Sequence, residues 1–193
     1  MNTLFVNAYL FVMAIALALL EIQVEGEHGW AKRLPTWRPH RRHWLARTFR
    51  RVMSGKDLTG YHLAIFGFVL LMFHLPYVFG LPFVFEHWLK TISLYFLFIT
   101  VWDFLWFVMN PHHPLSRFVG DSNPVHHRWL GPLPLDYYGS VALSLLVILP
   151  LVARVGLEPL IWWLTHLTSF VVLTLLVVWF TLKVLDIDNW LKR

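Results

Sequence analysis

Residues 103–136, DFLWFVMNPHHPLSRFVGDSNPVHHRWLGPLPLD, decide how the rest of this chain is interpreted. The stretch begins inside an apolar run that carries Asp103 and leaves that run at Asn110-Pro111, the first of two Asn-Pro sequences. A residue that precedes proline disfavours the α-helical conformation, so a helix is predicted to end at Asn110. Each Asn-Pro is closely followed by a pair of histidines. Four imidazoles in so short a segment add little to packing, which indicates a functional use.

The composition indicates a polytopic membrane protein. Of the 193 residues, 58% are hydrophobic and only 14% are charged, whereas a soluble domain of this size carries about 25% charged residues. Eleven tryptophans and sixteen phenylalanines are typical of a protein with aromatic belts at both membrane interfaces. The chain has no cysteine, which excludes disulfides, thiolate metal ligands, iron–sulfur clusters and cysteine nucleophiles.

Five apolar stretches are long enough to cross the hydrocarbon core of a membrane, which takes about 20 helical residues. The predicted spans are residues 4–23, 61–79, 86–109, 137–153 and 160–185. No basic segment precedes the first span, and its apolar run is longer than that of a signal peptide, so it is predicted to be a retained helix. The predicted fold class is all-α, with residues 1–193 forming a single integral membrane domain, a polytopic helical bundle.

One face of the first span is small and polar, which predicts packing against other helices rather than against lipid. At about 100° per residue this face is formed by Asn7, Ala14, Ala18, Glu21 and Glu25.

The distribution of charge predicts the orientation. Residues 25–60 form a loop with nine lysines and arginines, so the positive-inside rule places this loop in the cytoplasm, together with the histidine-rich loop 110–136. With five spans, the N-terminus is then outside and the C-terminus inside. This topogenic charge accounts for the net charge of +5, and we expect no nucleic-acid partner. The expected location is the bacterial inner (plasma) membrane.

The basic loop has a second interpretation. Its charges suit the binding of anionic lipid headgroups, and the segment Arg41–Arg51, with interleaved aromatic and aliphatic residues, could form a short interfacial helix.

On this topology, ionisable residues from several spans gather at the cytoplasmic side. A carboxylate inside a bilayer costs several kcal/mol unless it is paired, protonated, solvated or bound to metal, and carboxylates with imidazoles suit iron, manganese or zinc. Asn110 and Asp136 are predicted to orient imidazoles. The candidate metal ligands are Glu21, Glu25, His62, Asp103, His112, His113, His126 and His127.

Structural alternatives remain open for these residues. Asp103 could simply accept hydrogen bonds from neighbouring side chains, while the loop histidines lie in water at the headgroups. A b-type haem between His74 and His166 is a further alternative, supported only by two isolated histidines.

The histidine pairs His112-His113 and His126-His127 resemble the histidine clusters of the membrane fatty-acid desaturase and hydroxylase superfamily. The resemblance implies a di-iron centre on the cytoplasmic side and a lipid substrate. It covers these four residues only, because the chain has neither His-x-x-x-His nor His-x-x-His-His.

The leading functional hypothesis is a metal-dependent membrane enzyme, a non-haem iron oxidoreductase that acts on a lipid or other apolar substrate at the cytoplasmic interface. The substrate would enter laterally from the inner leaflet, and the metal would bind oxygen or activate water. One alternative is a non-catalytic protein that binds membrane lipids or a partner subunit, which includes a second copy of itself. Another is a small proton-coupled transporter with Glu21, His62 and Asp103 as its relay.

Overall fold

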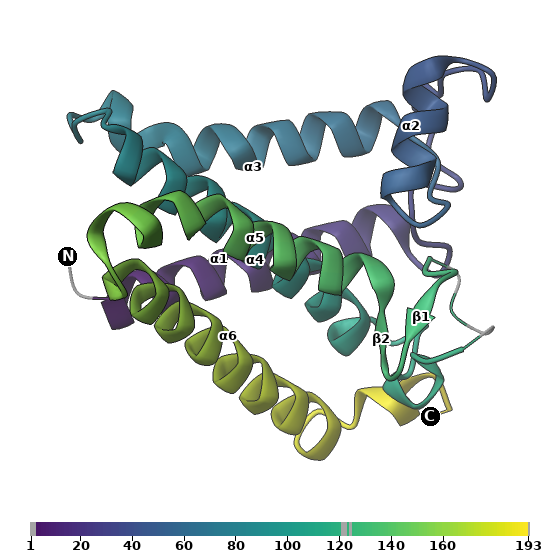
Figure 1. Ribbon diagram of the computed structural model, residues 1–193. Coiled ribbons are helices and arrows are strands. Elements are labelled where there is room, and N and C mark those ends of the chain that lie inside the picture. Colours follow the sequence, from purple (N-terminus) through teal and green to yellow (C-terminus); the bar gives the residue numbers. More distant parts are fainter. Residues whose placement is uncertain (1–2, 121–122, 124, 193) are drawn as a thin grey trace.

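The computed structural model describes residues 3–120, 123 and 125–192. Its α-helices are α1 (Thr3–Glu25), α2 (Trp44–Val52), α3 (Gly60–Val78), α4 (Phe85–Met109), α5 (Leu135–Val155) and α6 (Glu158–Lys183). Two short 3₁₀-helices, η1 (Leu115–Arg117) and η2 (Ile187–Lys192), and one antiparallel hairpin of β1 (Trp129–Leu130) and β2 (Leu133–Pro134) complete the described elements. The fold is therefore mainly helical, as predicted, apart from the small hairpin (Figure 1).

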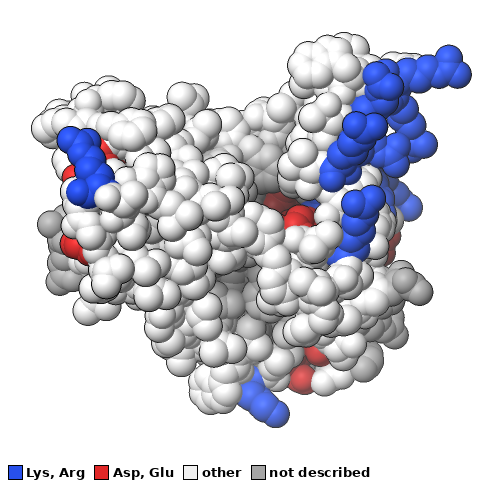
Figure 2. Space-filling model, viewed as in Figure 1, with Lys and Arg blue, Asp and Glu red and all other residues white. Residues whose placement is uncertain are grey.

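Five helical segments are long and apolar enough to cross a membrane, as is typical of an integral membrane protein. They correspond to α1, α3, α4, α5 and α6, and the ends of these helices differ from the predicted spans by at most two residues. On the face shown in Figure 2, lysine and arginine side chains lie toward the ends of the bundle, and the surface between them is largely uncharged apart from acidic atoms in a hollow. α2 has only nine residues and is not one of the candidate spans.

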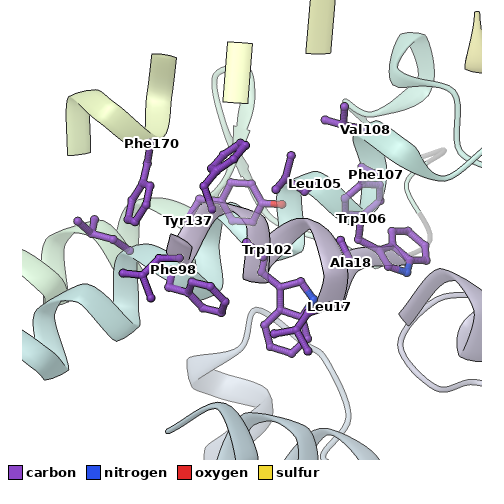
Figure 3. Packing of buried hydrophobic residues seen from close by; sticks show 14 of the residues in the cluster. Leu17, Ala18, Phe98, Trp102, Leu105, Trp106, Phe107, Val108, Tyr137 and Phe170 are labelled. Carbon is purple, nitrogen blue, oxygen red and sulfur yellow. The ribbon is translucent and has the colours of Figure 1, made fainter. Parts of the chain in front are cut away.

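α4 is the central helix of the bundle. Half of the most apolar stretch of α4 is buried inside the molecule, a larger share than in the other four candidate spans. α4 also contacts α1, α3, α5 and α6. Its buried side chains, which include Phe98, Trp102 and Leu105, form the core together with Tyr137 of α5 and Phe170 of α6 (Figure 3). The position of α4 places Asp103, in its last two turns, beside a cavity that Glu21 and Glu25 of α1 also line.

The predicted small and polar face of α1 is confirmed as a packing face. Asn7, Ala14, Ala18, Glu21 and Glu25 are all buried. Ala14 and Ala18 have no exposed surface, since small side chains let helix backbones approach closely. The same face carries Glu21 and Glu25 into the interior at the end of the helix.

The loop between α1 and α3 folds back over this end of the bundle. Gly29, Trp30 and Ala31 all have positive φ angles, of 58°, 48° and 52°, and this left-handed turn directs the Trp30 side chain inward. The segment Arg41–Arg51, for which a short helix was one prediction, contains most of α2. Thr59 ends the loop as the N-cap of α3, where its hydroxyl accepts a hydrogen bond from the backbone N–H of His62 at 3.2 Å.

Candidate metal centre

Two carboxylates and one imidazole meet where α1 ends and α3 begins. Glu21 and Glu25 lie one turn apart on α1, and His62 lies in the first turn of α3. Each offers one ligand atom, and these atoms all lie within 4.8 Å of one another. The Nε2 atom of His62 is 3.6 Å from Oε1 of Glu25 and 4.0 Å from Oε1 of Glu21. Such a set of donors is suited to iron, manganese or zinc.

The imidazole of His62 is fixed by its neighbours. Its Nδ1 lies 2.7 Å from the hydroxyl of Thr59, and Trp30 stacks on the ring with 3.8 Å between centroids. When Nδ1 carries the proton, it donates to Thr59 and leaves the Nε2 lone pair facing the two carboxylates. Metal-binding histidines are usually oriented by such a partner on the other ring nitrogen. Glu25 is fixed as well, because its Oε1 accepts a hydrogen bond from the backbone N–H of Ala31.

A second polar cluster surrounds His126. Its Nε2 lies 3.0 Å from Oδ2 of Asp103, and its Nδ1 lies 3.2 Å from Oδ1 of Asp136. The hydroxyl of Tyr137 donates to the same oxygen of Asp103 at 2.6 Å. Burial alone would lower the pKa of His126, but the charge of Asp103 and the hydrogen bonds to both aspartates outweigh it and raise that pKa above its ordinary value. His126 therefore lies between two carboxylates, with one ring nitrogen directed at each.

Lys56 lies between the two clusters. Only 4% of this residue is exposed. Its Nζ is 2.8 Å from Oδ2 of Asp136 and 3.9 Å from Oδ1 of Asp103, and it lies 4.7 Å from the ring centroid of Trp30, the side chain that stacks on His62. Lys56 thus joins the basic loop to α4 and α5.

Carboxylates outnumber the basic groups in the two clusters. Four carboxylates, on Glu21, Glu25, Asp103 and Asp136, lie within ion-pair distance of one lysine and two histidines among the described residues. Lys56 and His126 pair with Asp103 and Asp136, so neither of them pairs with Glu21 or Glu25. A buried carboxylate is stabilised when it is paired, protonated or bound to metal. Protons or a bound divalent cation would neutralise Glu21 and Glu25.

A cavity of about 250 Å³ adjoins both clusters. Its polar floor includes the four carboxylates and Lys56, and most of its wall is apolar side chains of α3, α4, α5 and the end of α2. Leu143 lines the cavity and is also exposed on the outer surface of α5. Figure 2 shows acidic atoms at the bottom of a hollow, beside the lysines and arginines gathered at that end of the molecule. The cavity suits a ligand with an apolar part and a polar part.

The eight predicted metal ligands divide into three groups. Glu21, Glu25 and His62 form the candidate metal centre. Asp103 and His126 belong to the second cluster, where Asp136 contacts His126. His112, His113 and His127 lie outside both clusters.

The outward position of the first histidine pair follows from the Asn110 side chain. Its amide oxygen accepts the backbone N–H of His112 at 3.0 Å and its amide nitrogen donates to the carbonyl of Gly26 at 3.1 Å, which fixes the backbone of the turn. His112 is exposed, and so is His127. His113 is half-buried with its Nε2 2.8 Å from the carbonyl oxygen of Glu27, and burial lowers its pKa. Its contacts account for His113 without a metal.

The second Asn-Pro turn directs one histidine inward. The side-chain oxygen of Asn123 accepts hydrogen bonds from the backbone N–H groups of Val125 and His126, at 2.9 and 2.8 Å. Pro124, the second residue of the motif, lies outside the described residues. Asn123 therefore sets the direction in which His126 enters the core.

Several residues of the site are not singled out by the sequence pattern. Lys56 resembles the other basic residues of its loop, and its burial depends on a turn with positive φ at Ser54 and Gly55, of 49° and 99°. Trp30 likewise depends on a left-handed turn. Thr59 did carry a signal, since a threonine just before a helical run is a preferred N-cap.

The two histidines considered for haem have other partners. His74 uses both ring nitrogens, because its Nδ1 lies 2.8 Å from the carbonyl oxygen of Leu70 and its Nε2 accepts from Trp88 at 3.2 Å. His166 contacts Asn7 through Nδ1. These contacts give both histidines a structural role between helices.

Comparison of the chain with protein-family models, with curated proteins and with solved structures finds no match. The function is therefore inferred from the site's own residues.

Proposed function

We propose that this protein is a metal-dependent membrane enzyme that acts on a lipid or other apolar substrate. Its divalent metal would be held by Glu21, Glu25 and His62. The observation that carries the proposal is that three buried ligand atoms, supplied by two helices, lie within 4.8 Å of one another beside a cavity with apolar walls. Among the described residues, no lysine or arginine lies within ion-pair distance of Glu21 or Glu25, and a divalent cation would neutralise both carboxylates.

The number of ligands favours catalysis over a purely structural metal. Structural zinc sites are usually closed by four protein ligands, whereas catalytic sites keep a position open for water or substrate. Three protein ligands next to a cavity fit the second case. Iron, manganese and zinc are all compatible with the donors. We favour iron and an oxidation, since the wall of the cavity suits a hydrocarbon chain; dioxygen would be the oxidant and an external donor would supply electrons.

The second cluster would assist at the floor of the cavity. Lys56, Asp103, Asp136 and Tyr137 all line it. The ammonium of Lys56 and the hydroxyl of Tyr137 are proton donors of residues that line the cavity, and a positioned donor contributes to catalysis by transferring a proton or binding a developing negative charge. His126 lies behind them and would hold Asp103 and Asp136 in place.

The proposed orientation has the site at the cytoplasmic face, with the N-terminus outside and the C-terminus inside. The loop that carries nine basic residues covers this end of the bundle, and the positive-inside rule then places it in the cytoplasm. The bacterial inner membrane is the proposed location. Because Leu143 both lines the cavity and is exposed on α5, substrate would enter laterally from the lipid.

Metal content tests the proposal. Untagged protein, purified in mild detergent and reconstituted under reducing conditions with iron, manganese or zinc, is expected to hold about one equivalent per chain. Glu25→Gln and His62→Gln should each lose most of this metal while helix content stays unchanged. His112→Gln and His127→Gln are the matched controls, because these histidines are exposed, and both should retain it.

Two results would overturn the proposal. One is substoichiometric metal in the reconstituted wild-type protein, with no difference between wild type and His62→Gln. The other is equal loss of metal from the control variants. A protein without metal that still binds lipid through its basic loop would support the non-catalytic alternative instead.

A further inference from the structure

α2 (Trp44–Val52) exposes a row of large apolar side chains. Because an α-helix turns about 100° per residue, Trp44, Leu45 and Val52 point to the same side. They are 62%, 42% and 70% exposed. The opposite side of the helix is fixed to the protein, since Ala46 is buried and the ring of Phe49 lies 6.5 Å from that of Trp30. The apolar row is therefore presented outward on a helix that is itself anchored next to the candidate site.

A cationic face lies beside this apolar row. Arg50 pairs with Asp57 at 3.3 Å, and Arg41 pairs with the same carboxylate at 3.6 Å. Arg42, Arg47 and Arg51 are exposed. Within the part of the chain that the structure describes, no carboxylate lies within ion-pair distance of them. In Figure 2, lysine and arginine side chains gather on this corner of the molecule. These three charges remain available to an anionic partner.

The spanning helices place α2 at the membrane boundary. α1 precedes it and α3 follows it, and both are long and apolar enough to cross the membrane. α2 is attached to the ends of these helices by residues 26–43 and 53–59, so it lies close to the plane in which they leave the hydrocarbon. A helix with an apolar face beside a cationic face typically lies in this interface.

We infer that α2 lies flat in the membrane interface and binds anionic phospholipid headgroups through Arg42, Arg47 and Arg51. Trp44, Leu45 and Val52 would lie among the upper segments of the acyl chains. Val52 also lines the cavity of the candidate metal centre, so this binding places anionic lipid at the cavity's edge. The inference rests on the charges and exposure of α2 and is independent of the metal.

A single fluorescent label tests the inference. The chain has no cysteine, and Thr48 is exposed on the outward side of α2, so Thr48→Cys accepts an environment-sensitive dye at this position alone. Full-length protein in detergent is titrated with dioctanoyl phosphatidylglycerol and, in parallel, with dioctanoyl phosphatidylcholine. The anionic lipid is expected to reach half-saturation at a concentration about 100-fold lower, because each of the three arginines contributes about fivefold. Glycerol phosphate, which has the anionic group without acyl chains, should give no comparable response.

Charge variants make the test specific. A basic residue near a membrane surface contributes about 1 kcal/mol, which is about fivefold in binding. Arg47→Gln/Arg51→Gln should therefore weaken binding of the anionic lipid about 25-fold and leave binding of phosphatidylcholine unchanged. Arg154→Gln is the control, because Arg154 lies in the last turn of α5, whereas Asp136 of the second cluster lies in the first turn. It should change the binding of neither lipid. The metal content of the double variant should equal that of the wild type, which separates this inference from the metal proposal.

Several outcomes would overturn the inference. They are equal responses to both lipids, no response to either, a full response to glycerol phosphate, or equal weakening by Arg154→Gln. A second measurement needs no label: mass spectrometry of the unlabelled protein should find anionic lipid that copurifies with the wild type and is depleted in the double variant. Equal lipid content in the two proteins would contradict the inference.

Discussion

Lys56→Met is expected to destabilise the protein strongly, although Lys56 belongs to a loop rich in basic residues. The side chain is buried, and its ammonium is 2.8 Å from Asp136 and 3.9 Å from Asp103. Methionine has a similar unbranched stem but no charge, so the substitution removes the two ion pairs and retains most of the packing. The variant therefore isolates the electrostatic contribution of this one group.

The expected magnitude follows from the distances. At an effective dielectric constant of about 20, unit charges separated by 2.8 and 3.9 Å attract by about 6 and about 4 kcal/mol before the cost of desolvation. Removing one partner from a buried pair costs about 3–5 kcal/mol, because the remaining charge stays buried without compensation. In a chain of this size each kcal/mol shifts the midpoint of thermal unfolding by about 2–4 °C, so the midpoint should fall by roughly 6–20 °C.

Thermal unfolding in detergent, followed by tryptophan fluorescence, measures this effect. Lys90→Met is the matched control, because Lys90 pairs with Glu86 at 2.9 Å and with the exposed Glu158 at 3.4 Å, and such surface pairs contribute about 0–1 kcal/mol. Lys56→Met/Asp136→Asn should recover part of the loss, since it removes one uncompensated carboxylate. If Lys56→Met lowers the midpoint no more than Lys90→Met, the two clusters are not held together by Lys56.

Two further predictions concern pH and backbone conformation. The folded-state pKa of His126 is raised, so its ion pairs contribute fully below the ordinary value of about 6.5 and their contribution is lost as pH rises through the raised pKa. The difference in thermal midpoint between wild type and His126→Asn should therefore narrow as the pH rises above about 6.5. A difference that widens over this range would contradict the prediction. Gly26 and Gly29 have nearly equal φ angles, of 59° and 58°. A Cβ added at Gly29 would lie 2.8 Å from Cγ2 of Val125, whereas a Cβ added at Gly26 would have no atom within 4 Å. Gly26→Ala should lower the free energy of unfolding by about 1–2 kcal/mol through backbone strain. Gly29→Ala should lower it measurably more in the same unfolding assay. Equal losses would show that Val125 moves aside without an energetic penalty.

The helices could be predicted from the sequence because membrane spans depend on local composition. Runs of about 20 apolar residues, ended by Asn110-Pro111 or by polar turns, mark them to within two residues. The packing face of α1 was predictable for the same reason, since Ala14, Ala18, Glu21 and Glu25 recur with the helical period. The hairpin at residues 129–134 was not predicted, because its two-residue strands are too short to show a pattern.

The site could be predicted only where helices set the direction of its side chains. Glu21 and Glu25 share a face of α1, and His62 starts the next span, so helical geometry places the three at one depth. The packing of α3 then brings His62 to the two carboxylates. The directions of loop side chains depend on individual turns. Asn123 turns His126 inward, while Asn110 holds the turn that leaves His112 exposed. A histidine pair alone therefore does not predict which ring reaches the interior.

The most direct measurement is X-ray absorption at the metal edge of the reconstituted protein. Imidazole rings give a distinct multiple-scattering signal, which allows the number of histidine ligands to be counted. Glu21, Glu25 and His62 predict a first shell of oxygen and nitrogen with one imidazole, and His62→Gln should remove that signal. Two or more imidazoles, or an unchanged signal in His62→Gln, would place the metal among other histidines and contradict the proposed centre.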